Sequence, residues 1–398
     1  MPTPRRTILK RLGAAAVVTT GAAVVNGTTS ASAATASGED DILLDSFTGT
    51  DDQKLTAALD LARTSSPRRP IRLSPRSHTF SQTRTTFSGL RILGPNVGWQ
   101  NPEIANTAGA LPQCNVTLNC GNGAKSWLVG TSTTYNVMVA GITFKSSNGV
   151  SQFYHHPYSA GTSYATTLDT LSFFGFKHVL GTPADPFSMT LVTTKGSWTC
   201  VGVQDTQFSL RGSDNFLWVA GDLNYGWQGA NQGRYLMRFS NLSKTAVKHL
   251  YLTARGGSRA VLVEATTQGG LDFTDCVIEG QNANDQAMGA LIVTKGQASF
   301  TNIKLNFAMA RPTDFTDQKD TGYIMVLGGT ALINNVWVNK ANLPGTSTQV
   351  SESIPVVDVR GGTAYVGTVI GCGAGWAAKP LARAAGGTLV ADQSLRTS

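Results

Sequence analysis

One short apolar pattern recurs along the chain and limits the folds that the chain can adopt. It consists of an apolar residue, a small or polar residue two positions later, and then two further apolar positions. Its copies are Val139–Phe144, Leu168–Phe173, Val247–Leu252, Phe273–Ile278, Phe300–Leu305, Ile333–Val338 and Val366–Gly371, with a degenerate copy at Val203–Phe208. Copies at intervals of roughly thirty residues, with insertions between them, indicate stacked repeats. Each copy predicts one or two short strands that bury their apolar face only against neighbouring copies.

The composition and the spacing together predict an all-β fold. Charged residues make up only 14% of the chain, and glycine occurs 43 times. No helical pattern of 10–15 residues separates the copies, which argues against βαβ repeats. We therefore expect a right-handed parallel β-helix, a solenoid that forms a single domain over residues 46–398.

The repeat also changes how several polar residues are interpreted. The third position of successive copies holds Asp205, His249, Asp275, Asn302 and Asn335. Side chains of Asn and Asp at one register in a stack can bond to neighbouring turns. We expect a structural ladder at these positions, and no reactive pair between Asp275 and Cys276.

A single amphipathic helix is predicted ahead of the repeats. Thr50 or Asp51 is a suitable N-cap, and Leu55, Ala58, Leu59 and Ala62 line one face. A helix laid across the end of a β-helix would cover its first coil. Residues 46–95 are therefore expected to form the cap and the first coil.

The same region carries a family resemblance. Ser46–Ala62, followed by Ile71–Phe80 and Phe87–Gly94, resembles the start of pectate-lyase-like, or glycoside hydrolase family 28-related, β-helices, a superfamily that includes phage tailspike-like proteins. Ser46–Gly49 and Pro75–Ser77 depart from the pattern of that group. The resemblance implies a β-helix and a polysaccharide ligand, and it supplies no catalytic motif.

The N-terminus resembles a twin-arginine signal peptide over residues 1–33. Arg5 and Arg6 precede an apolar stretch from Gly13 to Val25, and Ala31–Ala33 suits a signal peptidase. Residues 34–45 would then be a linker, and we expect a secreted, extracellular protein. Removal of the segment lowers the net charge from +8 to about +4. No basic block indicates nucleic acid, and no later segment is long and apolar enough to span a membrane.

Five cysteines leave the redox state open. Cys114 and Cys120 flank a short stretch and could form a disulfide in an oxidising compartment. The other three lie in apolar strand patterns that favour buried thiols.

Two insertions between the copies hold the candidate site residues. For hydrolysis, the predicted carboxylate pair is Asp214 and Asp222. For elimination from a uronate, the candidate bases and charge neutralisers are His155, His156, Arg211 and Arg234. The predicted sugar-stacking residues are Trp218, Tyr225, Trp227 and Tyr235. Equally, these aromatic residues could fill an irregular coil and the acids could form Asx turns.

The sequence thus predicts a secreted β-helix that binds an extracellular polysaccharide, with hydrolase or lyase activity left open. The alternative is a non-catalytic adhesin, structural spike or carbohydrate-binding scaffold. No acid-dense cluster favours Ca²⁺ or another metal, no cofactor is expected, and either a monomer or a homotrimer is compatible with the pattern.

Overall fold

The computed structural model describes residues 41–95, 114–120, 126–146, 152–190, 193–195, 199–201, 208–211, 216–224, 235–253, 259–279, 291–306, 322–339, 355–372 and 381–391. The chain divides into two compact units, Met1–Glu39 and Asp40–Ser398, and all described residues belong to the second. The predicted signal peptide at residues 1–33 lies outside the described residues and stays a prediction.

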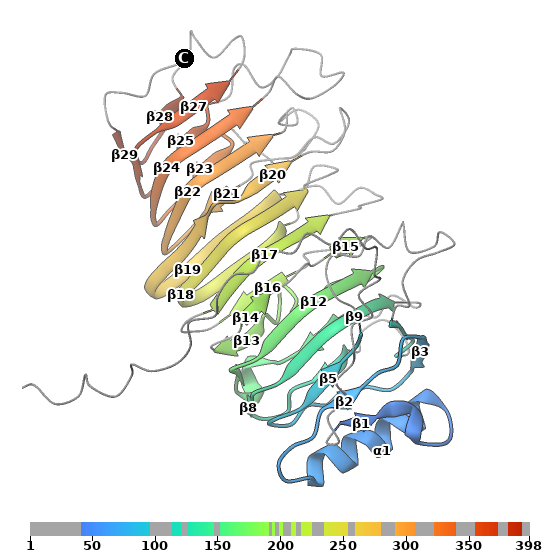
Figure 1. The fold of residues 1–398 in the computed structure, drawn as a ribbon. Helices are drawn as coiled ribbons and strands as arrows, with labels where there is room; N and C mark the ends of the chain where they lie inside the picture. The colour runs from blue at the N-terminus through green and yellow to red at the C-terminus, as the bar shows by residue number, and fades with distance from the viewer. Residues whose placement is uncertain are drawn as a thin grey trace, which may run out of the picture. The chain divides into compact units, whose positions relative to one another are not determined.

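The described strands form three rows, in which each strand pairs in parallel with its counterpart in the next coil (Figure 1). The first row contains β1 (Ile42–Leu43), β2 (Ile71–Arg72), β5 (Arg91–Leu93), β14 (Thr193–Lys195), β26 (Thr363–Val366), β29 (Thr388–Ala391) and the first parts of β9 (Met138–Ser146), β12 (Thr167–Phe174), β17 (Phe216–Asn224), β22 (Gln297–Asn306) and β24 (Thr330–Asn339).

The second row follows the first along the chain. It contains β3 (Ser77–Phe80), β6 (Asn115–Leu118), β15 (Thr199–Val201), β20 (Val277–Glu279), β27 (Val369–Cys372) and the last parts of β9, β12, β17, β22 and β24.

The third row closes each coil. It contains β4 (Arg84–Thr85), β7 (Ser126–Val129), β10 (Gln152–His155), β16 (Phe208–Arg211), β21 (Leu291–Val293), β23 (Ile324–Val326), β25 (Val357–Val359) and β28 (Ala382–Ala384). β18 (Tyr235–Thr253) and β19 (Arg259–Thr274) run from the third row into the first, and β18 continues into the second. β8 (Thr134–Tyr135), β11 (Ser163–Tyr164) and the end of β13 (Phe187–Thr190) form a short additional row. The parallel β-solenoid predicted from the repeat is confirmed, and its right-handed sense stays a prediction.

The third position of the repeat is the corner between the first and second rows. Its backbone is left-handed in six copies, with φ of 65° at Gly141, 50° at Thr170, 55° at His249 and Asp275, 56° at Asn302 and 53° at Asn335. Thr368, the third position of the last copy, does not have a positive φ. The Asn302 side-chain amide donates to Asp275 Oδ1 at 2.7 Å, and the Asn335 amide donates to Asn302 Oδ1. His249 Nδ1 lies 3.8 Å from Asp275 Oδ2. The predicted ladder is therefore confirmed for Asp275, Asn302 and Asn335.

The degenerate copy at Val203–Phe208 is a wrong assignment. Phe208 pairs with Met237 in the third row, whereas the pattern required a place in the second. The register instead places Ala220 opposite His249, because Val219 pairs with Lys248 and Gly221 with Leu250. Asp205, the residue assigned to the ladder, lies outside the described residues.

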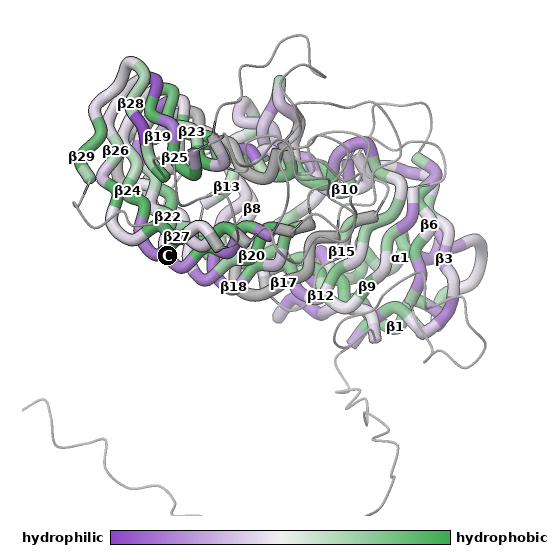
Figure 2. Tube along the Cα trace, turned by 90° about the horizontal axis from the view of Figure 1, so that it is seen from above, coloured by the Kyte–Doolittle hydropathy of each residue, from purple (hydrophilic) through white to green (hydrophobic). Residues whose placement is uncertain are grey.

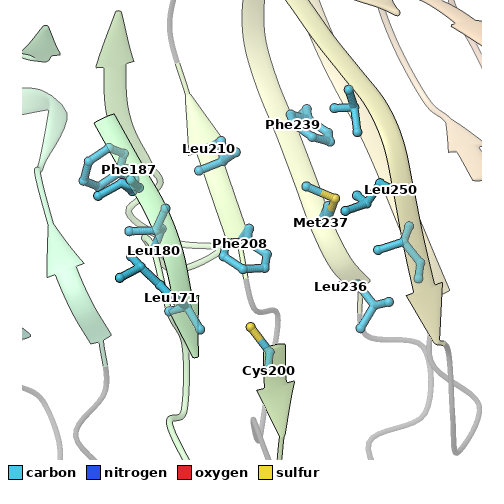
Figure 3. Packing of buried hydrophobic residues seen from close by; sticks show 14 of the residues in the cluster. Leu171, Leu180, Phe187, Cys200, Phe208, Leu210, Leu236, Met237, Phe239 and Leu250 are labelled. Carbon is cyan, nitrogen blue, oxygen red and sulfur yellow. The ribbon is translucent and has the colours of Figure 1, made fainter. Parts of the chain in front are cut away.

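Buried and more exposed residues alternate along strands such as β3 and β22. Figure 2 shows hydrophobic and hydrophilic residues mixed along each coil. The N-terminal coils stack aromatic rings on one another. The ring of Trp127 lies 5.2 Å from Phe144, which in turn lies 4.6 Å from Phe153. Further along, Leu180, Phe208, Met237 and Leu250 continue the same core (Figure 3). Cys114, Cys120, Cys200 and Cys276 are all buried in this core.

Glycines form the corner between the third and first rows in the C-terminal coils. Gly329 and Gly362 have φ near 70°, and a Cβ on either would collide with backbone of the preceding coil. We call this corner, at Gly296, Gly329 and Gly362, the glycine corner. It permits only short connections such as Thr294–Gly296 between β21 and β22.

The first coil is covered by α1 (Asp51–Thr64), as the amphipathic pattern predicted. Thr50 and Gln53 form a reciprocal capping box, and Leu55, Ala58, Leu59 and Ala62 are buried. A 3₁₀ turn, η1 (Leu44–Ser46), precedes it. Ile42 pairs with Ile71, so ordered structure begins within the stretch assigned to the linker.

Candidate functional site

The third row is interrupted by an excursion of the chain, which we call the Gly181 loop (residues 181–186). Leu180 bridges Tyr154 on one side and Phe208 on the other, in line with the third row. The chain then leaves the row and returns at Phe187, which pairs with Leu210. Within the loop, Thr182 N–H donates to the Asp185 carbonyl and Asp185 N–H donates to Thr182 Oγ1, each at 3.0 Å. These two bonds close a tight turn.

The loop depends on the residue that opens it. Gly181 has φ of 65°, and a Cβ there would collide with the backbone nitrogen of Phe187 and the carbonyl oxygen of Ser209. Glycine reaches this conformation without a steric penalty, and it leaves room for the next coil. The sequence Gly181-Thr-Pro-Ala-Asp-Pro186 is thus built for a tight excursion.

Two contacts hold the loop against the outer face of the third row. His155 Nε2 lies 3.1 Å from Asp185 Oδ2. From the opposite side, Arg238 donates from a guanidinium nitrogen to the Pro183 carbonyl at 2.8 Å. His155 and Arg238 belong to β10 and β18, so the loop bridges strands on both sides of its own coil.

A third contact crosses the same face. The guanidinium carbon of Arg211, at the end of β16, lies 4.0 Å from the centre of the Tyr158 ring. Tyr158 opens the 3₁₀ turn η2 (Tyr158–Ala160), which follows Pro157 and ends at Gly161 with φ of 103°. Among the described residues, Tyr158 is the most exposed large apolar side chain, at 60%. A guanidinium over a phenol ring is attracted to its π face, which favours this orientation of the ring.

The histidines of this region are biased toward their neutral form. Burial lowers the pKa of His155, although the charge of Asp185 and its hydrogen bond act in the opposite direction. The His155 side chain is 18% exposed and that of Asp185 is 48% exposed. His155 Nδ1 is buried and has no hydrogen-bond partner among the residues that the structure describes. A neutral His155 that donates from Nε2 to Asp185 therefore orients the loop at ordinary pH.

His156, the other candidate base, points into the protein. Its side chain is fully buried, and its Nε2 lies 3.1 Å from the Ser132 carbonyl. Burial also lowers its pKa, against a hydrogen bond to Ser132. The structure thus brings His155 and Arg211 to one face and places His156 beneath it.

The backbone register locates three of the remaining predicted site residues, Asp222, Trp218 and Tyr235. Asp222 and Trp218 lie on β17, where the backbone register sets Asp222 opposite Tyr251 and Trp218 opposite Val247. Tyr235 begins β18 opposite Arg259. Asp214, Tyr225, Trp227 and Arg234 lie outside the described residues. Asp222 is thus in the second row, whereas His155 and Arg211 are in the third.

Sequence reasoning missed Asp185 and Arg238. Both act through the Gly181 loop, and neither belongs to a repeat copy. The signal that could have revealed Asp185 is the glycine and proline punctuation around it, since such a turn projects from a regular row.

A second polar cluster lies farther along the third row. Asp358 on β25 is fully buried, and Arg383 Nε donates to Asp358 Oδ1 at 2.8 Å while Arg360 Nε donates to Asp358 Oδ2 at 3.2 Å. The hydrogen bond that Arg383 donates to Asp358 raises the pKa of Arg383. A carboxylate engaged by two guanidinium groups is suited to structure rather than to proton transfer.

Two wider properties concern the described ranges. Within them, no three His, Cys, Asp or Glu side chains gather closely enough to hold a metal ion. None of the helices there has the length and apolar character needed to cross a membrane.

Comparison with known proteins gives few matches. No protein-family model and no curated protein matches the chain. Among solved structures, the chain is similar to one described as "Crystal structure of Agl-KA catalytic domain", with a TM-score of 0.48 and 12% sequence identity. The alignment covers 89% of this chain and 69% of that one.

Proposed function

We propose that the protein binds an extracellular polysaccharide on the outer face of the third row, at Tyr158, Arg211, His155 and Asp185. The observation that carries the proposal is Tyr158, an exposed ring that Arg211 contacts on its π face and that follows His155, the partner of Asp185, by three residues. An exposed aromatic face offers a stacking surface to a pyranose, and the neighbouring polar groups can bond to its hydroxyls. Because residues from neighbouring coils build this face, a polysaccharide lying along the stack of coils would contact all of them at once.

Binding is better supported than cleavage. Hydrolysis of a glycosidic bond uses two carboxyl groups on either side of it. In the described part of this face, Asp185 supplies one carboxylate, and it is engaged by His155. A second candidate function, hydrolysis, would draw on Asp214. That residue follows Arg211 by three positions in the sequence.

If the protein cleaves its ligand, elimination from a uronate is the alternative to hydrolysis. Arg211 would neutralise the substrate carboxylate and His155 would accept the proton. The buried Nδ1 of His155 and the engaged Nε2 mean that such a step requires the Gly181 loop to open.

The location of this function follows from the N-terminus. We propose export through residues 1–33 by the twin-arginine route, which carries folded proteins. Replacement of Arg5 and Arg6 by lysine is expected to keep the protein inside the cell, as measured by its distribution between cells and medium.

The binding proposal is tested with a panel of neutral and acidic polysaccharides. We expect Tyr158→Ala to weaken binding about tenfold, a loss of about 1.4 kcal/mol, because it removes the ring on which the sugar stacks. The matched control is Tyr365→Ala, which removes a tyrosine that is 47% exposed on β26. Equal affinity for Tyr158→Ala and the parent protein would refute this site.

Cleavage is assayed on the same panel through new reducing ends and the absorbance of unsaturated uronates. Activity that is lost in Asp214→Asn would establish hydrolysis at this face. Retained binding with silence in both assays would establish a non-catalytic adhesin or binding scaffold, the alternative that the sequence left open.

A further inference from the structure

A second line of exposed or half-buried side chains runs along the outer face of the second row. From Tyr251, two residues after the left-handed corner, it continues through Val277, Lys304, Trp337 and Ile370. The backbone register joins them in this order from coil to coil. We call these five residues the Trp337 column. In the coil before Tyr251 the register places Asp222 at the same position. The column belongs to a different row from the Gly181 loop.

The column places aromatic rings in solvent. Trp337 is 43% exposed and Tyr251 is 37% exposed, and both lie on described strands whose inward residues are fully buried. Neighbouring coils are about 4.8 Å apart, which is close to the length of one pyranose in an extended chain. A polysaccharide that runs along the stack would therefore meet a new side chain of the column at nearly each sugar.

The polar ladder fixes the orientation of the tryptophan. Its indole N–H donates to Asn335 Oδ1 at 2.8 Å, and Asn335 in turn donates to Asn302. One end of the indole is thereby tied to the corner of the solenoid. A ring held in this way loses little freedom when a ligand stacks on it.

A cation accompanies the ring. Lys304 Nζ lies 5.9 Å from the centre of the Trp337 ring. Lys304 is exposed, and among the described residues its ammonium group forms no ion pair. The nearest carboxylate of the ladder, Asp275, is engaged by Asn302 and faces His249. The column therefore offers one unneutralised positive charge beside one fixed aromatic face.

We propose that the Trp337 column is a second glycan-binding surface, and that it selects polysaccharides with carboxylates on their pyranose rings. Trp337 stacks on a sugar ring and Lys304 binds the carboxylate of that sugar or the next. This surface does not rely on Tyr158, Arg211 or the Gly181 loop, so it stands or falls separately from the site proposed above.

The test measures the affinity of the full chain for an alginate oligosaccharide and for its carboxyl-reduced counterpart. We expect Trp337→Ala to weaken alginate binding about tenfold, and Lys304→Glu to weaken it by at least as much. Affinity for alginate should fall as salt is raised, because the charge pair is exposed and screened. The carboxyl-reduced oligosaccharide should bind less tightly and show little dependence on salt.

Two matched variants serve as controls. Tyr365→Ala removes an aromatic residue of similar exposure from the first row, and Lys295→Glu reverses an exposed lysine on the same coil as Lys304. Both should bind alginate as the parent does. Lys304 is exposed, so Lys304→Glu removes no buried side chain, and it still tests the proposal if Trp337→Ala folds poorly.

Three results would overturn the proposal. One is unchanged alginate affinity in Lys304→Glu, and another is equal affinity for the two oligosaccharides. The third is a change of oligomeric state in Trp337→Ala, seen by size-exclusion chromatography, with alginate binding intact. That last result would make the column an interface between copies of the chain.

Discussion

The residues at the left-handed corner explain why polar side chains recur in an apolar pattern. A left-handed conformation costs roughly 1–2 kcal/mol for most L-residues and less for Asn and Asp. Asp275, Asn302 and Asn335 occupy it and also bond to one another across coils. One choice of residue therefore satisfies the local backbone and ties neighbouring coils together. Residues that looked reactive in the sequence serve this purpose.

At the same scale, Gly181→Ala is expected to disrupt the candidate site, whereas Gly175→Ala is not. Both glycines have φ of 65°, so an added Cβ strains both backbones to a similar extent. At Gly181 the Cβ also collides with Phe187 and Ser209, while at Gly175 the nearest atom is the Ser146 carbonyl oxygen at 3.4 Å. A difference between the two variants would therefore report on the Gly181 loop rather than on backbone strain.

The measurement is glycan affinity together with the melting temperature of each variant. Gly181→Ala should weaken polysaccharide binding several-fold and melt lower than Gly175→Ala. The same affinity and melting temperature in both variants would show that the loop tolerates a Cβ and does not position the site.

Among the elements, helix α1 stabilises the solenoid by covering its first coil. Leu55 is fully buried against that coil, whereas Leu61 on the same helix is 40% exposed. Truncation of a buried leucine costs about 2–5 kcal/mol, and an exposed one costs little. We therefore expect Leu55→Ala to destabilise the N-terminal coils and Leu61→Ala to leave them nearly unchanged.

Hydrogen exchange resolved by segment would check this expectation. Leu55→Ala should speed exchange in α1, β2 and β5, and leave β24 and β26 protected, because coils of a solenoid are coupled mainly to their neighbours. Equal protection in the two variants would contradict the capping role.

The elements also show how far the sequence could predict the fold and the site. Apolar spacing identified the corners at His249, Asp275, Asn302 and Asn335, because inward residues flank each of them. It failed at Asp205, since Phe208 supplies a similar apolar spacing from the third row, whereas the true corner near Ala220 lacks a polar residue. His155 was a candidate base from its sequence, yet its partner Asp185 is brought close only by the conformation of a loop.

At the scale of the whole molecule, stability should fall as the pH is lowered through about 6.5. Three of the five histidines, His78, His155 and His156, have pKa values lowered chiefly by burial. The unfolded chain then binds more protons than the folded one between the lowered pKa values and the ordinary value of about 6.5. The stability that these three neutral histidines contribute is fully present above that pH and is lost below it.

Thermal melting between pH 8 and pH 5 tests this expectation. The melting temperature should hold steady from pH 8 to 7 and decline below about 6.5. His155→Gln should lessen the decline, because it removes one titrating group. A melting temperature that rises or stays constant from pH 7 to 5 would contradict the expected role of the buried imidazoles.

A second acid-sensitive group lies around the cap. Hydrogen bonds from Arg76, Ser74 and Lys54 hold the pKa of Asp45 well below its usual range, although burial opposes them. Burial acts to raise the pKa of Asp51, but bonds from Arg76 and the Thr79 N–H outweigh it and lower that pKa. The stability that the ionised Asp45 and Asp51 contribute is present above the usual aspartate pKa and is lost as the pH falls below about 4.

The glycine corner has a consequence for how such a chain can change in length. Gly329 and Gly362 touch the backbone of the previous coil, so added residues there would push the coils apart. In the sequence, the longer stretches, residues 280–290, 307–321 and 340–354, each follow a strand of the second row and precede a strand of the third. Insertions, epitope tags or grafted peptides should be accepted at those stretches and rejected at the glycines. In each repeat, the connection after the second row can thus vary in length, whereas the connection at the glycine corner cannot.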